Sequence, residues 1–180
     1  MAIRDEIWIQ PYQAPCGSLL LGACRGKLCL CNWEQERHPG RVMARLRAFY
    51  GVESRTGATE ITDEAARQLD DYFTRRRTRF DLPLQFIGTD FQKSVWRALL
   101  DIPYGQTASY RELAVAIGAP SAVRAVANAN GANALSIIVP CHRIVGSDHS
   151  LTGYAGGLDA KRFLLKWEQG ENFGAFRNVL

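Results

Sequence analysis

The 180-residue sequence contains no long apolar run, which argues against a chain that crosses a membrane as a helix. No uninterrupted apolar stretch approaches the roughly 18 residues that a transmembrane helix requires. The first ten residues, MAIRDEIWIQ, mix acidic and basic groups and lack the apolar core of a secretory signal. These absences predict a cytoplasmic protein, and 47% hydrophobic with 22% charged residues is typical of a globular chain.

Internal repeats, low-complexity segments and a glycine-rich phosphate loop are also absent. The five cysteines are odd in number and irregularly spaced, which argues against a disulfide framework. Four of them, Cys16, Cys24, Cys29 and Cys31, crowd the N-terminus without forming a Cys-x-x-Cys pair. We interpret Cys29 and Cys31, which alternate with leucines, as small buried residues of one strand face, with a metal site as the minor alternative. The sequence therefore predicts no metal and no other cofactor.

The net charge of +4 permits a polyanionic partner but does not require one. Positive charge is not concentrated in either half, so we expect any contact with nucleic acid to be local rather than a broad basic stripe.

The first half predicts short strands followed by two helices. The stretches IWIQ, GSLLLGAC and KLCLCNW are typical of strands, with a hairpin turn at Arg25-Gly26. RVMARLRAFYG predicts a helix with Val42, Leu46 and Phe49 on its buried face and Gly51 as its stop. A second helix is expected from Thr62, with three arginines at positions 75, 76 and 77 in its last turn. These arginines are either a DNA-binding patch or a solvated helix end, and the helix dipole favours the second interpretation.

The extended segment around Pro83 predicts a domain boundary, with residues 1–84 as a small strand-rich α/β domain and residues 85–180 as a mostly helical domain. The fold class is therefore α+β. The second domain opens with a helix in TDFQKSVWRALLDI, for which Thr89 is the expected cap.

A helix-turn-helix is predicted next. Ser109 and Glu112 have the spacing of a capping box, and Gly118 ends the first helix. The second helix, SAVRAVANANG, is expected to be capped by Ser121 after a three-residue turn. Such a corner also occurs in helical domains that bind no nucleic acid. Apart from Arg124 the second helix carries small side chains, which fit a narrow groove better than the base contacts usual in the major groove.

Cys141 stands in SIIVPCHRIVG, which reads as a buried strand stopped by Pro140. It is either a core cysteine or a nucleophile held rigidly at the end of a strand. A nucleophilic thiol is expected to need its pKa lowered by a nearby cation or base, and His142 follows directly. The imidazole would in turn need an orienting acid, for which Asp159 and Glu168 are available. From the pattern alone, Glu168 is equally compatible with an exposed helix end and with a buried partner.

The segment RAVANANGANALSIIVPCHRIVG, with LTGYAGG and KRFLLKWEQG after it, resembles the O6-alkylguanine-DNA alkyltransferase family, the methylated-DNA–protein-cysteine S-methyltransferases. The resemblance covers about half of the chain, from residue 91 to residue 170. It implies DNA repair by irreversible, stoichiometric transfer of the alkyl group from O6-alkylguanine, and from O4-alkylthymine, to the protein's own cysteine. Cys141 matches the alkyl acceptor, His142 the base that acts through a water, Glu168 the acid that orients it, and Asn133 the residue that braces the turn.

The resemblance also implies a partner, double-stranded DNA from which the alkylated nucleotide is flipped. Tyr110 matches the tyrosine that helps to rotate the nucleotide out and protonates the guanine, and Arg124 matches the arginine that takes the vacated place in the stack. The other residues implied to contact DNA or the base are Ser109, Ala122, Asn130, Ile144, Tyr154, Ala155 and Lys161. A monomer without membrane association is implied, and cooperative binding along DNA is left open.

Some positions depart from the commoner family pattern. Ala134 stands where a proline is frequent, Asn128 where a glycine or alanine is, and Ala155 where some members have serine. Cys24 and Cys29 fall near two zinc-ligand positions of some relatives, but no matching histidine follows, so no zinc is carried over. Two other hypotheses remain open: a DNA-binding regulator in which the cysteine is only a core residue, and a thiol hydrolase.

Overall fold

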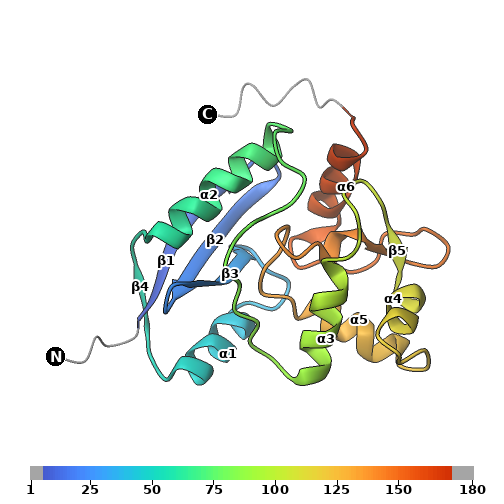
Figure 1. Ribbon diagram of the computed structural model, residues 1–180, viewed down its shortest axis with the longest axis horizontal. Coiled ribbons are helices and arrows are strands. Elements are labelled where there is room, and N and C mark those ends of the chain that lie inside the picture. Colours follow the sequence, from blue (N-terminus) through green and yellow to red (C-terminus); the bar gives the residue numbers. More distant parts are fainter. Residues whose placement is uncertain (1–5, 172–180) are drawn as a thin grey trace.

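The computed structural model of the protein describes residues 6–171. A four-stranded sheet forms the core of its N-terminal half (Figure 1). The three predicted strands are present as β1 (Ile7–Ala14), β2 (Gly17–Cys24) and β3 (Lys27–Trp33), and they form an antiparallel meander. The short strand β4 (Ser54–Thr56), which was not predicted, pairs in parallel with β1, so the strand order is β3-β2-β1-β4.

The turn between β2 and β3 falls at Arg25-Gly26, as predicted. Arg25 has φ 52° and Gly26 has φ 71°, so both residues are left-handed. Two left-handed residues are the signature of the two-residue turn whose twist matches that of the flanking strands. This turn sets the register that buries Cys24, Cys29 and Cys31.

Helix α1 (Arg41–Tyr50) buries Val42, Leu46 and Tyr50. It ends where predicted, because Gly51 adopts a left-handed conformation with φ 68° and donates its N–H to the carbonyl oxygen of Arg47. The prediction that Phe49 belongs to the buried face is wrong, since it is 54% exposed. The last turn buries the neighbouring Tyr50 instead.

Helix α2 (Glu60–Phe73) lies along one face of the sheet (Figure 1) and begins two residues earlier than predicted. Thr59 and Thr62 form a reciprocal capping box at its start. The helix ends at Phe73, so the prediction that arginines 75 to 77 occupy its last turn is wrong. Arg75 has φ 60°, a left-handed conformation that turns the chain away from the helix axis.

The second half is mostly helical, with α3 (Asp90–Leu99), α4 (Tyr110–Ala116), α5 (Val123–Gly131) and α6 (Gly157–Glu168). The short strands β5 (Ala108–Ser109) and β6 (Ile144–Val145) pair in parallel. The cap predicted at Thr89 and the capping box predicted at Ser109 are both present, and Thr89 also forms a capping box with Gln92. No helix within residues 6–171 is long and apolar enough to cross a membrane.

The turn of the helix-turn-helix is longer than predicted. Residues 117–122 separate α4 from α5, and Ala122, not Ser121, is the N-cap residue of α5. Ala122 donates its backbone N–H to the carbonyl oxygen of Ala119, so a local turn around Pro120 takes up the residues expected to begin the helix. No side chain caps α5.

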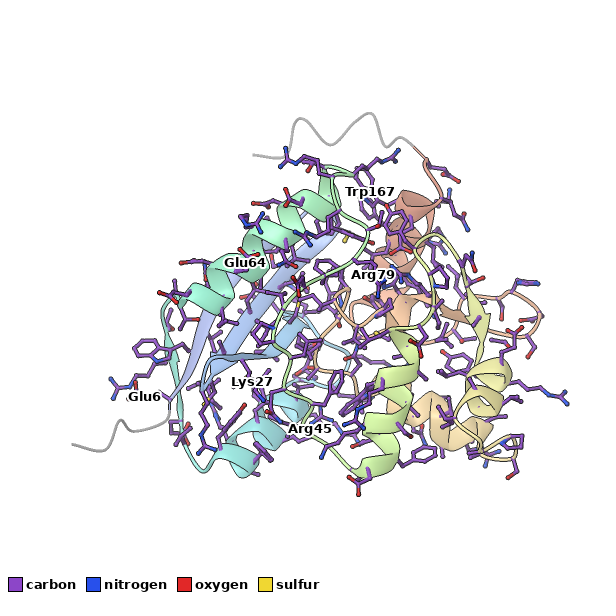
Figure 2. The ribbon with its side chains drawn as sticks, viewed as in Figure 1. Glu6, Lys27, Arg45, Glu64, Arg79 and Trp167 are labelled. Atoms are coloured by element: carbon purple, nitrogen blue, oxygen red, sulfur yellow. The ribbon has the colours of Figure 1, made fainter. Side chains whose placement is uncertain are left out.

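The two halves share strand β3 as a common edge. The carbonyl oxygen of Leu28 accepts the N–H of Gln85 at 2.8 Å, and the N–H of Cys31 donates to Ala134 O at 2.8 Å. Arg45 of α1 reaches the second half (Figure 2), donating to Ala132 O at 2.7 Å. The segment that precedes Cys141 is therefore fixed to the N-terminal sheet. The boundary at residue 84 stays a prediction.

Replacing Thr89 by Ala removes the hydroxyl that accepts the N–H of Gln92 at the start of α3. We expect the free energy of unfolding to fall by about 1 kcal/mol, measured by urea denaturation. Thr89→Ser keeps the oxygen and serves as the control. Equal losses for the two variants would show that the cap contributes nothing.

Candidate active site

Cys141 lies in a turn and not at the end of a strand, so that prediction is wrong. Residues 136–138 form turns, and Cys141–Arg143 is a short 3-10 helix. The apolar run satisfies its backbone groups locally: Val139 donates to Leu135 O and Cys141 donates to Val139 O, both at 2.8 Å. A short buried apolar run has no periodicity that distinguishes such turns from a strand.

Asn133 braces this turn with its side-chain amide. Its Nδ2 donates to Val139 O at 2.9 Å, and its Oδ1 accepts the N–H of Leu135 at 2.9 Å. Inside the loop so formed, Ile137 has φ 70°, a rare conformation for a β-branched residue. Such a strained conformation persists only where the surrounding contacts enforce it. Here the amide of Asn133 bonds the backbone on both sides of Ile137, at Leu135 and Val139.

Burial raises the pKa of the Cys141 thiol above its ordinary value, so the expected acidification is wrong for the free protein. The side chain is 3% exposed. A hydrogen bond with Asn133 and the positive charge of Lys161 favour the thiolate but do not outweigh desolvation. The resting thiol is therefore protonated, and a nearby base would have to remove its proton to form the thiolate.

His142 is fully buried and bonded to Glu168, with 2.8 Å between Nε2 and Oε1. The carboxylate can only accept, so Nε2 carries the proton and Nδ1 holds a lone pair. Among the described residues, Nδ1 has no hydrogen-bond partner. Burial lowers the pKa of His142, although Glu168 opposes that shift, so the ring is neutral and able to accept a proton.

Glu168 is buried, which answers the question left open by its position at the end of α6. The guanidinium of Arg143 donates two hydrogen bonds to its carboxylate, from Nε to Oε2 at 2.9 Å and from Nη2 to Oε1 at 3.0 Å. Tyr72 and Gly105 donate to it at 2.8 and 3.1 Å. Burial alone would raise the pKa of Glu168, but His142 and Arg143 hold it well below its usual value.

Sequence reasoning missed Arg143 and Tyr72. Arg143 stood in the quoted motif and was passed over because a guanidinium beside a turn is usually exposed. Tyr72 lies on the buried face of α2, and nothing in the sequence indicated which group its hydroxyl would meet.

Lys161 of α6 is fully buried, and its ammonium donates to Thr152 O at 2.8 Å. Burial lowers its pKa to about 8, and the neighbouring Cys141 partly opposes this shift. The side chain thus ties the 152–156 loop to α6 and places a positive charge near the thiol.

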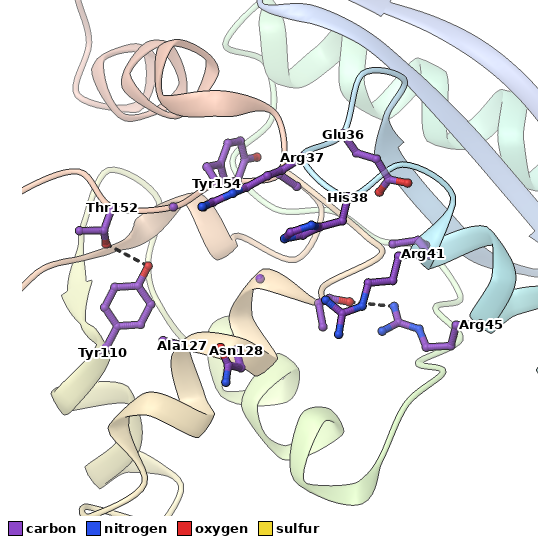
Figure 3. A pocket seen from close by; sticks show the side chains of 15 residues that line it. Glu36, Arg37, His38, Arg41, Arg45, Tyr110, Ala127, Asn128, Thr152 and Tyr154 are labelled. Carbon is purple, nitrogen blue, oxygen red and sulfur yellow. Dashed lines mark hydrogen bonds between the residues drawn. The ribbon is translucent and has the colours of Figure 1, made fainter.

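A cavity of about 540 Å³ opens between the second half and the β3–α1 connection. Figure 3 shows Tyr110 and Thr152 on one side, joined by a 3.2 Å hydrogen bond. We call the opposite side the cationic wall; it is formed by Arg37, His38, Arg41 and Arg45. The sequence did not indicate this wall, because Arg37 and His38 lie in an irregular segment of mixed charge, whereas Arg41 and Arg45 lie on α1.

Tyr154 and Ala155, predicted to contact the base, line this cavity. The loop that carries them packs closely on Trp33: a Cβ on Gly156 would come within 2.4 Å of the indole ring. Only glycine fits at that position, which holds the loop against β3.

Tyr110 lines the cavity as well, but the other predicted contact residues do not. Arg124 is exposed and lies with Ala122 at the start of α5, whereas Ser109 caps α4. Asn130 and Ile144 are buried, and Asn130 Nδ2 donates to Cys141 O at 3.4 Å. The structure therefore separates a buried group around the thiol from a surface group on the helix-turn-helix.

The N-terminal cysteines are free thiols, and three of them lie in the core. Within residues 6–171, no three His, Cys, Asp or Glu side chains are grouped so as to hold a metal ion. The absence of a cofactor stays a prediction.

Comparison with known proteins gives three kinds of similarity. A family model for the DNA binding domain of 6-O-methylguanine DNA methyltransferase matches residues 90–170. A methylated-DNA–protein-cysteine methyltransferase of Methanosarcina barkeri is 61% identical over 106 residues, which cover 59% of this chain and 67% of the relative. One from Methanosarcina acetivorans is 56% identical over 109 residues, 61% of this chain and 70% of the relative. The crystal structure of Mycobacterium tuberculosis OGT in complex with DNA has 42% identity and a TM-score of 0.76, covering 90% of this chain and 92% of that one.

Replacing Glu168 by Gln leaves the buried Arg143 without its carboxylate. We expect a loss of about 3–5 kcal/mol in the free energy of unfolding at neutral pH, measured by urea denaturation. The folded pKa of Glu168 lies below the unfolded value, so its stabilising effect is complete above about pH 4.3 and is lost as the pH falls toward the folded pKa. The difference in the free energy of unfolding between wild type and Glu168→Gln should therefore become smaller as the pH is lowered.

The control is Asp159→Asn, which removes an exposed carboxylate from the same helix. Screening by solvent makes its expected effect small at every pH. A difference between wild type and Glu168→Gln that does not change with pH would contradict an ionised Glu168.

Proposed function

The chain belongs to the methylated-DNA–protein-cysteine methyltransferase family, and we propose that it repairs DNA by transferring the alkyl group of O6-alkylguanine to its own Cys141. The observation that carries this proposal is the buried constellation around the thiol, in which His142 has one nitrogen bonded to Glu168 and the other free. The fold match extends over nine-tenths of the chain to a protein whose structure contains DNA.

The transfer is a displacement at the carbon attached to O6 of guanine. The sulfur of Cys141 forms a bond to that carbon as the bond between carbon and O6 breaks. The thiol proton passes to Nδ1 of His142 through a water, and the guanine takes up a proton as it leaves, for which Tyr110 is the proposed donor. The product thioether is not hydrolysed, so each molecule reacts once.

His142 acts as the base because the resting thiol is protonated. Its Nε2 is committed to Glu168, which directs the lone pair of Nδ1 away from the carboxylate. The positive charge of Lys161 lowers the cost of forming the thiolate in a dry site. Deprotonation is thus coupled to the reaction and not present beforehand.

The helix-turn-helix supplies the DNA contact, and α5 enters the minor groove. Small residues let this helix approach closely, and the exposed Arg124 fills the place of the nucleotide that is flipped out. Flipping costs a few kcal/mol and is cheaper for a poorly paired, damaged base. The cavity of about 540 Å³, which Cys141 does not itself line, falls within the range of small-ligand sites and is the proposed place for the flipped nucleobase.

The cationic wall supports binding of a polyanion next to this cavity. Arg37, His38 and Arg41 are exposed, and their side chains have no hydrogen bond or ion pair to any described residue. The unpaired guanidinium groups of Arg37 and Arg41, beside an extrusion site, neutralise the phosphates that flank the flipped nucleotide. A monomer, two domains divided at residue 84 and a cytoplasmic location remain part of the proposal.

Incubation with an oligonucleotide containing O6-methylguanine should raise the intact mass of the protein by one methylene unit per chain, mapped to Cys141 by peptide mass spectrometry. Cys141→Ala should bind the DNA without any gain in mass, whereas Cys16→Ser, which alters a half-buried cysteine, should react as wild type does. Removal of the methyl group from DNA by Cys141→Ala would refute the assignment. Binding by the wild type without a gain in mass would favour a DNA-binding regulator.

Replacing Arg41 by Gln removes one charge from the cationic wall. We expect the slope of log Kd against log salt concentration to fall by about 0.9 for any duplex, measured by fluorescence anisotropy. Arg47→Gln is the matched control, because Arg47 lies on the same helix, pairs with Glu53 and does not line the cavity. If the slope for Arg41→Gln equals that of wild type, the cationic wall does not contact DNA.

A further inference from the structure

Tyr72 brings the N-terminal half into direct contact with the buried group around the thiol. It lies near the end of α2 and is fully buried. Its hydroxyl donates to Oε1 of Glu168 at 2.8 Å, across 96 residues of sequence. The same oxygen accepts the Nε2 proton of His142 at 2.8 Å. Tyr72 therefore shares an acceptor with the proposed base.

We propose that Tyr72 is a positioning residue for alkyl transfer, which acts through Glu168 to hold His142 in its reactive tautomer and orientation. This inference rests on the proposed function. It gives the N-terminal half a defined part in the chemistry, in addition to its part in the fold.

The hydroxyl of Tyr72 can act only as a donor here. Burial and the negative charge of Glu168 raise its pKa well above the ordinary value, so the proton stays on the oxygen. Because an ionised carboxylate can only accept hydrogen bonds, the hydroxyl of Tyr72 must point its hydrogen toward Glu168. Together with Arg143, this donor fixes the orientation of Oε1 toward the imidazole.

The position of Tyr72 is set by several contacts between the ends of α2 and α6. The indole N–H of Trp167, which lies between these helices in Figure 2, donates to Tyr72 O at 3.2 Å. Arg75 stacks over the Trp167 ring at 4.4 Å and donates to the carbonyl oxygens of Gly170 and Glu171. The ring of Tyr72 also meets Tyr104 edge-on, with 5.9 Å between centroids. A side chain held in this way holds Glu168 in turn.

Removal of the hydroxyl should make His142 more basic. The ionisable and charged groups that face His142 are Glu168 and Lys161 of α6, Arg143 beside it, and Cys141. Of these, only Glu168 favours the protonated ring, since the two cations oppose it. Without the bond from Tyr72, Oε1 concentrates its charge on His142, and the imidazolium is stabilised.

The test is Tyr72→Phe, which keeps the ring and removes only the hydroxyl. The single-turnover rate constant for methyl transfer from an O6-methylguanine oligonucleotide should fall about tenfold at neutral pH. The acid limb of its pH profile should move to higher pH. Affinity for unmodified duplex should not change. The control is Tyr12→Phe. It removes from β1 a hydroxyl that donates to Asp70 of α2, away from the site, and its rate constant and pH profile should equal those of wild type.

A double-mutant cycle with His142→Gln separates positioning from general stability. If Tyr72 acts through His142, Tyr72→Phe should cause no further loss of rate in that background. Equal losses in both backgrounds, or a pH profile identical to that of wild type, would overturn the inference. If Tyr72→Phe does not fold, Trp167→Phe loosens the same tyrosine and should shift the acid limb in the same direction. If wild type itself acquires no methyl group, the proposed function fails, which is a different outcome.

Discussion

The ionised carboxylate of Glu168, held in the interior, is the constraint on which the rest of the site depends. It accepts five hydrogen bonds, from Tyr72, Gly105, His142 and, twice, Arg143. A buried charge without such partners would cost several kcal/mol. These donors come from α2, from the connection after α3 and from the turn at Cys141. The charge can therefore be buried only when both halves of the chain have come together.

Because Glu168 must receive these hydrogen bonds, the turn that carries the thiol of Cys141, His142 and Arg143 has to be held in one conformation. Asn133 closes the turn, Ile137 is held in a strained conformation, and the following 3-10 helix directs His142 and Arg143 to one carboxylate. The segment just before the turn is attached to β3, so the sheet and the site share one framework. Rigid support of this kind is what a reacting group needs to keep its geometry.

The sequence predicted those parts of the structure that follow local rules. The hairpin at Arg25-Gly26 and the caps at Thr89 and Ser109 depend on a few neighbouring residues, and all three are present. The strand expected before Cys141 was wrong because apolar character reports burial and not backbone shape. The partners of Glu168 were beyond local reasoning, since Tyr72 is 96 residues away. The family resemblance implied which residues react, and those roles stay proposals; it did not indicate the charge state of the thiol or the cationic wall.

The raised pKa of Cys141 has a consequence for the proposed function, in which each molecule reacts only once. Peroxides and soft electrophiles react with exposed thiolates far faster than with protonated thiols that solvent does not reach. A sulfur stored in its neutral form within a dry interior is thereby protected from oxidation and adventitious alkylation. In the proposed function, the burial that keeps this thiol protonated also keeps it intact until it meets the alkylated base.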